Sequence, residues 1–328
     1  MSFKTLGYRL LAQMGGPAKE GREAIAFMMT HGVHSAAMAA AVPPPRNSFP
    51  AEAFEANIRA LARHWSVISL DDAVAMLTGK AAWRSNCVVL TFDDSLKCMA
   101  DVSAPLLASL GLTATFFVST GVIDSRKPYW WRRLEYAVSH ATQPEAQIAL
   151  PSGEVLTLNA ASADETLPRV KAGLKSVAPG VLDSLVESVE RQLGAALRCG
   201  SGTDPYAEIL SWEDVRRLDK LGMSVGSHTV THPNLALLES EELRSELAES
   251  RWKIEAECGT PCRHLCYPYG SCNAAVLEAA RACGYVSAVT TEAPGWNARG
   301  TDLHALRRFA MPAEAFKLPY VLAGFGRD

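Results

Sequence analysis

The chain has 328 residues, of which 48% are apolar and 20% are charged, which is an ordinary composition for a globular protein with a large core. Its net charge of −3 and sequence isoelectric point near 6.3 give no electrostatic basis for a nucleic-acid partner. The length allows one large α/β domain or two smaller ones.

The eight cysteines are interpreted as reduced thiols, because no secretion signal precedes them and a chain this long can build a core without disulfides. Five of them lie within 258–283 at spacings that match no zinc-ribbon pattern, so we expect buried small side chains. The most apolar stretch, 24–42, contains His31, Gly32 and His34, which argues against a membrane span. We therefore expect a cytoplasmic protein.

Predicted strands and helices alternate along both ends of the chain. After a weakly patterned leader, 1–23, the apolar periodicity predicts strands at 25–29, 87–92, 114–118, 223–226, 264–267 and 286–290. It predicts helices at 50–64, 73–77, around 106–110, from 212, at 240–257 and at 274–283. At least six strand–helix units predict a (β/α) barrel, complete or distorted, with active-site groups at the carboxyl ends of its strands.

The alternation is interrupted between about 125 and 207. An aromatic and basic cluster at 129–134 is followed by polar sequence and then by a predicted helix at 180–196. We interpret this region as a mainly helical insertion in a domain that spans 24–312 and is followed by a tail, 313–328.

Polar motifs follow three of the predicted strands: Asp93-Asp94, then His228 and His232, then Tyr267-Pro268-Tyr269-Gly270. Alone, each has an ordinary explanation as a helix cap, packing histidines or a turn. Two histidines four residues apart and one carboxylate form a three-ligand set, which leaves positions open for water and substrate, as in catalytic zinc sites. Their common place at strand ends favours a metal site.

The same motifs resemble those of the polysaccharide deacetylases of the NodB-homology type, carbohydrate esterase family 4. Thr91-Phe92-Asp93-Asp94 is similar to the first family motif, Ser227-His228-Thr229-Val230-Thr231-His232-Pro233 to the second, and Cys266-Tyr267-Pro268-Tyr269-Gly270 to the third. The resemblance extends over 24–124 and 209–312 and excludes the insertion. It implies a distorted (β/α) barrel of the NodB type.

The resemblance also implies a metal-dependent hydrolase that removes an N-acetyl (or other N-acyl) group from an aminosugar of a polysaccharide or glycoconjugate. Asp94, His228 and His232 would bind a divalent ion, Zn²⁺ by preference, and Asp93 would be the general base for metal-bound water. The backbone N–H of Tyr269, together with the metal, would stabilise the oxyanion.

The chain departs from the family pattern at three places. Ser95 stands where the family has glycine, so that turn is expected to differ. The third motif lacks its arginine, and Arg308, within 306–309, is the candidate replacement. The late Leu-x-His motif is not recognisable, which leaves His304 and His31 as competing candidates for the general acid.

Two alternative functions remain open at this stage. One is a deformylase or deacetylase of a lipid-linked sugar at the cytoplasmic membrane face, with the stretch 316–322 as a candidate for peripheral membrane contact. The other is a carbohydrate-binding relic without catalysis, suggested by Ser95 and the unidentified acid. Trp130, Trp131 and Trp296 are candidates for stacking on sugar rings or for core packing. The sequence gives no indication of oligomeric state.

Overall fold

The computed structural model describes residues 23–42, 44–45, 48–291 and 293–322. The predicted leader, apart from its last residue, and the final part of the predicted tail lie outside the described residues.

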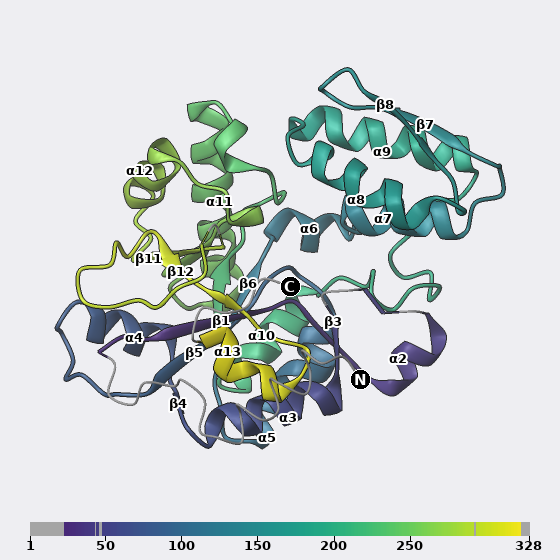
Figure 1. Ribbon diagram of the computed structural model, residues 1–328. Helices are drawn as coiled ribbons and strands as arrows, with labels where there is room; N and C mark the ends of the chain where they lie inside the picture. Colours follow the sequence, from purple (N-terminus) through teal and green to yellow (C-terminus); the bar gives the residue numbers. More distant parts are fainter. Residues whose placement is uncertain (1–22, 43, 46–47, 292, 323–328) are drawn as a thin grey trace.

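A parallel sheet forms the centre of the molecule (Figure 1). Its main strands are β1 (Ala26–Thr30), β5 (Cys87–Phe92), β6 (Thr115–Val118), β9 (Ser224–Ser227), β10 (His264–Cys266), β11 (Ser287–Thr290), β12 (Leu306–Arg307) and β13 (Phe309–Ala310). Their order is β12-β11-β10-β9-β6-β5-β1-β13, and the short β4 (Ser66–Val67) pairs with β5.

The two edge strands of this sheet come from one short piece of chain. β12 pairs with β11 at one edge, β13 pairs with β1 at the other, and only Arg308 separates β12 from β13. The segment 306–310 therefore reaches both edges, and the sheet curls into a nearly closed barrel. The predicted distorted (β/α) barrel is confirmed.

The apolar sequence of β5 follows from its place inside the sheet. All six of its residues are buried, as expected for a parallel strand that is covered on both faces. Val88 and Leu90 pack into the large core beneath the helices. Val89 points to the opposite face and packs with Phe27 and Phe117. Both faces of the strand are thus mainly apolar, and charged residues begin only after it ends, at Asp93.

The helices around the barrel lie close to their predicted positions. They are α3 (Ala51–Ala62), α4 (Leu70–Leu77), α5 (Ala104–Ser109), α10 (Trp212–Lys220), α11 (Ser240–Cys258) and α12 (Ala274–Ala282). Ser69 caps α4, since its hydroxyl accepts a hydrogen bond from the Asp72 N–H at 3.0 Å. Shorter elements complete this part: α2 (Ala36–Ala41), α6 (Thr120–Ser125), α13 (Leu318–Leu322) and the strand pair β2 (Gly32–His34) and β3 (Ser48–Pro50).

The stretch considered for membrane contact is partly buried in the protein. Leu318, Tyr320 and Leu322 are at most 7% exposed, and both leucines belong to the main core. Core packing therefore accounts for their apolar character. Among the described residues, no helix has both the length and the apolar character that a membrane span requires.

The region between α6 and α10 forms a lobe beside the barrel, at the upper right of Figure 1. It contains α7 (Trp130–Ser139), the antiparallel hairpin β7 (Ala146–Ala149) and β8 (Val155–Leu158), α8 (Ala163–Leu174) and α9 (Pro179–Leu193). The hairpin was not predicted, whereas α9 matches the predicted helix. The lobe has its own apolar cluster, including Leu134, Leu158, Val170 and Val186.

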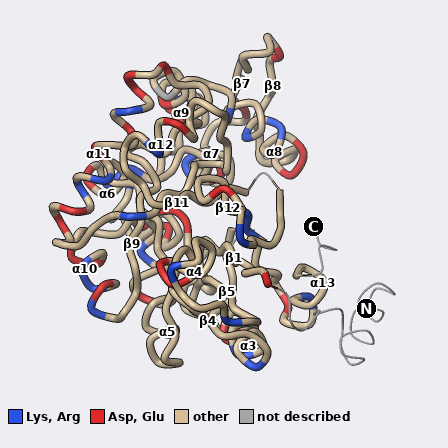
Figure 2. Tube along the Cα trace, turned by 90° about the vertical axis from the view of Figure 1, so that its left-hand side faces the viewer, with Lys and Arg blue, Asp and Glu red and all other residues tan. Residues whose placement is uncertain are grey.

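Charged residues of both signs are interspersed along the covering helices (Figure 2). This mixture agrees with the small net charge of −3. Of the eight cysteines, Cys87, Cys98, Cys262 and Cys266 are buried, and the other four are partly exposed. Of the five cysteines within 258–283, which were expected to be buried, only Cys262 and Cys266 are.

Candidate active site and metal centre

The carboxyl ends of the central strands bring the predicted motifs into one cavity. Thr30 at the end of β1 lies opposite Phe92 at the end of β5, so His31 and Asp93 emerge side by side. Ser227 of β9 lies opposite Leu265 of β10, which brings the second and third motifs together in the same way. The cavity at this end of the barrel has a volume of about 320 Å³.

Three of the lining side chains form a compact set of metal-binding type. The Oδ1 atom of Asp94 lies 3.6 Å from Nε2 of His228 and 3.4 Å from Nε2 of His232. The three side chains are buried, and their ligand atoms all lie within 4.8 Å of one another. Two imidazole nitrogens and one carboxylate oxygen are the donor set of many catalytic zinc sites, with room for further ligands. These residues fit a divalent ion.

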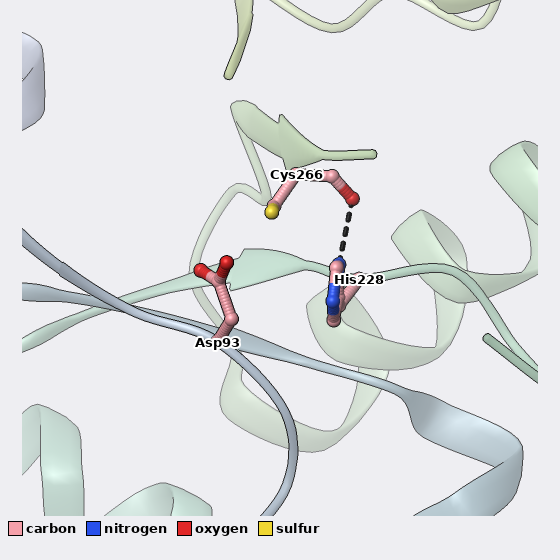
Figure 3. Close-up of side chains that lie close together, drawn as sticks. All are labelled: Asp93, His228 and Cys266. Carbon is pink, nitrogen blue, oxygen red and sulfur yellow. Dashed lines mark hydrogen bonds between the residues drawn. The ribbon is translucent and has the colours of Figure 1, made fainter. Parts of the chain in front are cut away.

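The ring of His228 is fixed by a backbone contact. Its Nδ1 lies 2.7 Å from the carbonyl oxygen of Cys266 (Figure 3). A carbonyl oxygen only accepts, so Nδ1 carries a proton, and Nε2, on the side of Asp94, is the ring atom that can bind a metal in the neutral ring. This is the usual outer support of a metal-ligating histidine. Burial acts to lower the pKa of His228, but contacts with Cys266 and Asp94 raise it well above its usual value, so a bound ion would have to displace the Nε2 proton.

The ring of His232 is enclosed by aromatic side chains instead. Its centroid lies 5.3 Å from that of Tyr129, 5.2 Å from Trp131 and 4.8 Å from Tyr269. Burial lowers the pKa of His232, which favours the neutral ring that binds metals. Burial also acts to raise the pKa of Asp94, but contacts with the two histidines hold that pKa well below its usual range.

Asp93 is held by a buried arginine. Nη1 and Nη2 of Arg308 each donate to one oxygen of Asp93, both at 2.7 Å, and the two side chains are at most 5% exposed. Nη1 also lies 3.0 Å from Oγ1 of Thr91. Burial acts to raise the pKa of Asp93, but the charge and hydrogen bonds of Arg308 outweigh it and lower that pKa. Asp93 is therefore ionised at neutral pH.

A second group of possible ligands contains Asp93, His228 and Cys266, whose ligand atoms also lie within 4.8 Å of one another (Figure 3). Nη2 of Arg308 donates to Asp93 and lies 3.2 Å from the Cys266 sulfur. A guanidinium that contacts two members repels a cation from this group. The set centred on Asp94 is the better metal site.

The backbone of the site is unusual. Asp94, Thr229, His232 and Tyr269 have positive φ angles of 74°, 68°, 60° and 60°, and they make up four of the six non-glycine residues with positive φ in the described part of the chain. Such conformations cost on the order of 1–3 kcal/mol each and persist where surrounding contacts enforce them. Their concentration in the three motifs indicates a backbone held in place for function.

Ser95 does not occupy the strained position of its turn, because the left-handed residue is Asp94. The Ser95 hydroxyl accepts from the Ser119 N–H at 2.8 Å, and the Ser119 hydroxyl donates to the His228 carbonyl at 2.9 Å. The Ser95 N–H donates to the Tyr129 hydroxyl at 3.1 Å. Ser95 thus connects the turns that carry two of the proposed ligands.

Glu246 supports the second motif and was missed in the sequence. Its Oε2 accepts from the N–H groups of Val230 and Thr231 at 2.7 and 3.0 Å, and its Oε1 accepts from the Thr231 hydroxyl at 2.6 Å. The sequence feature that could have indicated this role is an acidic residue on the same face of α11 as the buried Leu243 and Leu247.

The structure distinguishes between the two candidates for the general acid, His31 and His304. His31 lines the cavity and is half-buried. His304 is not among the lining residues, and its Nε2 lies 2.9 Å from the carbonyl oxygen of Tyr285. The structure therefore does not bring His304 to the site, because the chain after β11 holds His304 against the Tyr285 backbone before it reaches Arg308.

Two of the three tryptophans considered for sugar stacking are in the right place. Trp130 and Trp131 line the cavity, and the Trp130 Nε1–H donates to the Tyr269 hydroxyl at 2.9 Å. Trp296 is not a lining residue; its Nε1–H donates to the Leu322 carbonyl at 2.7 Å, and its ring packs against Phe309. Of the two interpretations left open for Trp296, the structure agrees with core packing.

Comparison with known proteins agrees with this architecture. PplD, a deacetylase from Streptococcus pyogenes solved with acetate, superposes over 93% of this chain and 99% of its own with a TM-score of 0.60 and 17% identity. IcaB from Ammonifex degensii superposes over 90% of this chain and 94% of its own with a TM-score of 0.58 and 15% identity. At such low identity these likenesses concern the fold.

Sequence comparison adds the family. The Bacillus subtilis protein YxkH, named as a polysaccharide deacetylase, is 33% identical over 99 residues, which are 30% of this chain and 35% of YxkH. The match thus spans about a third of that relative. The sequence profile of the family described as polysaccharide deacetylase matches residues 80–288, which is more than half of the chain and includes all three motifs. The chain belongs to the polysaccharide deacetylase family.

Proposed function

We propose that this protein is a metal-dependent hydrolase of a carbon–nitrogen bond, which removes an N-acetyl or other N-acyl group from an aminosugar of a polysaccharide or glycoconjugate. One observation carries the proposal. The buried set Asp94, His228 and His232 lies beside an arginine-paired Asp93 in a single cavity of a polysaccharide deacetylase fold. Membership of the family agrees with this chemistry.

Asp94, His228 and His232 would hold the ion, for which Zn²⁺ suits the donor set. When bound, such an ion lowers the pKa of water and provides positive charge near the acyl oxygen. Asp93 takes the proton of the attacking water, and Arg308 fixes the orientation of its carboxylate.

The remaining roles fall to residues around the cavity. The Tyr269 N–H makes no hydrogen bond with any described residue, and Tyr269 lines the cavity, so this N–H is available to the developing oxyanion. His31 is our proposal for the general acid, which protonates the leaving amine, because it lies in the cavity beside the Asp93 strand end.

Purified protein loaded with Zn²⁺ tests the proposal through acetate release from N-acetylated glycans. We expect turnover that a chelator abolishes and that added Zn²⁺ restores. Asp93→Asn should retain the metal, measured by elemental analysis, and lose about 10²-fold or more in kcat. Turnover that persists in metal-free protein would contradict the metal role. Glycan binding without any turnover in the loaded wild type would favour a binding relic.

A further inference from the structure

Two further cavities, lined in part by the inserted lobe, share lining residues with the cavity at the proposed metal site. A cavity of about 440 Å³ shares Trp130, Lys175, His232 and Tyr269 with the central one. A third cavity, of about 720 Å³, shares Asp94, Trp131 and Lys171 with the central one. A glycan chain can therefore extend past the metal site, with neighbouring sugars under the lobe.

Lys175, at the carboxyl end of α8, stands where the central cavity meets the 440 Å³ cavity. Its Nζ lies 5.4 Å from the centroid of the Tyr269 ring, so the ammonium group lies over the site. The Lys175 carbonyl accepts from Nδ2 of Asn234 at 3.1 Å, and Asn234 follows the second motif by one residue. The lysine is thus positioned relative to the proposed metal ligands.

Among the described residues, no acid is paired with Lys175. Lys171, one helical turn earlier, differs in this respect, since its Nζ lies 2.7 Å from Oε1 of Glu135. Of the acids that line the two cavities, Asp93 is paired with Arg308, Asp183 is paired with basic residues of the lobe, and Asp94 lies against the two histidines of the proposed metal set. An uncompensated ammonium group remains at the junction.

We infer that Lys175 forms an anion subsite, which binds a carboxylate or phosphate group attached next to the N-acylated sugar of the substrate. The inference rests on the proposed function and narrows its substrate class to acidic glycans or sugar phosphates. Lys175 is exposed, so its ammonium group is accessible to a substrate anion from the two cavities that it lines, and it attracts that anion by a Coulomb interaction that water screens. The ordinary alternative is that Lys175 only holds the lobe against Tyr269.

Three probes separate these possibilities. A heparosan oligosaccharide carries glucuronate carboxylates beside N-acetylglucosamine, UDP-N-acetylglucosamine carries phosphates, and penta-N-acetylchitopentaose is neutral. In Lys175→Met we expect the kcat/KM ratio of an acidic probe to the neutral probe to fall about tenfold, mainly through KM. Lys175→Arg, which keeps the positive charge, should retain most of the wild-type kcat/KM ratio. Lys171→Met is the matched control, and its ratio should change less than about threefold because Lys171 already has an acidic partner.

The outcomes are distinct. If Lys175→Met lowers the kcat/KM ratio to the neutral probe only for the heparosan oligosaccharide, the bound group is a carboxylate. If it lowers that ratio only for UDP-N-acetylglucosamine, the bound group is a phosphate. An equal loss on all three probes shows that Lys175 only clamps the lobe and overturns the inference, as does an unchanged ratio. If the wild type turns over no probe, the proposed function fails, and the subsite is tested by calorimetric binding of each acidic probe to wild type and Lys175→Met. Equal affinities would then refute it.

Discussion

Arg308 bonds both carboxylate oxygens of Asp93, at 2.7 Å each, across 215 positions of sequence. The contact exists because the chain at 306–310 joins the two edges of the sheet, and Arg308 is the one residue between β12 and β13. The residue that closes the barrel therefore also positions the proposed catalytic base.

The Asp93–Arg308 pair should behave as a coupled unit in stability measurements. Asp93→Asn and Arg308→Met each leave a buried charge without its partner, so each should lower the free energy of unfolding by about 3–5 kcal/mol. The double variant buries neither charge and should lose less than the sum. Urea unfolding of the four proteins measures this coupling; additive losses would show that the pair is not coupled. Both variants that carry Asp93→Asn should lose about 10²-fold or more in kcat, whatever their stability.

Loss of Arg308 should change the pH dependence of activity. Arg308 lowers the pKa of Asp93, and burial acts in the opposite direction. In Arg308→Gln burial is unopposed, so the pKa of Asp93 rises and the base is protonated over a wider acidic range. The acidic limb of the kcat/KM profile should move to higher pH by at least about one unit. A limb that stays in place while kcat falls would show that Arg308 does not set the ionisation of the base.

Glu246 should govern metal affinity without touching the metal. It accepts three hydrogen bonds from the loop that carries His232, so Glu246→Ala should release that loop. We expect metal affinity to fall roughly 10–100-fold, as for other outer supports of metal ligands. Equilibrium dialysis with Zn²⁺ measures the change. Glu242→Ala, an exposed acid of the same helix, is the control, and an equal loss there would contradict a specific role for Glu246.

Ser95 should contribute through its hydroxyl. Ser95→Ala removes the acceptor of the Ser119 N–H, which is fully buried, and should cost about 1–3 kcal/mol of unfolding free energy. Ser95→Gly should give a similar loss, because the left-handed position of the turn is Asp94. Ser109→Ala, at an exposed serine, should change stability by less than about 0.5 kcal/mol. A glycine variant as stable as wild type would show that the hydroxyl network does not matter.

Local sequence is sufficient to predict the main elements and the chemical motifs of this chain. An uninterrupted apolar run such as 87–92 is typical of a buried parallel strand, and the acids that follow it must emerge at its end. His228 and His232, which are four residues apart, lie in one loop after β9. These features depend on neighbouring residues, so they can be read from periodicity and spacing.

Which distant residues meet depends on the tertiary fold. Barrel closure brought Arg308 to Asp93, while His304, only four residues earlier, bonds to the Tyr285 backbone outside the cavity. Packing of α11 placed Glu246 under the histidine loop, and the inserted lobe placed Lys175 beside the site. Such pairings depend on strand order and on how the chain returns to the sheet. No local pattern encodes them, because the interacting groups lie far apart in the chain and meet only when the barrel closes.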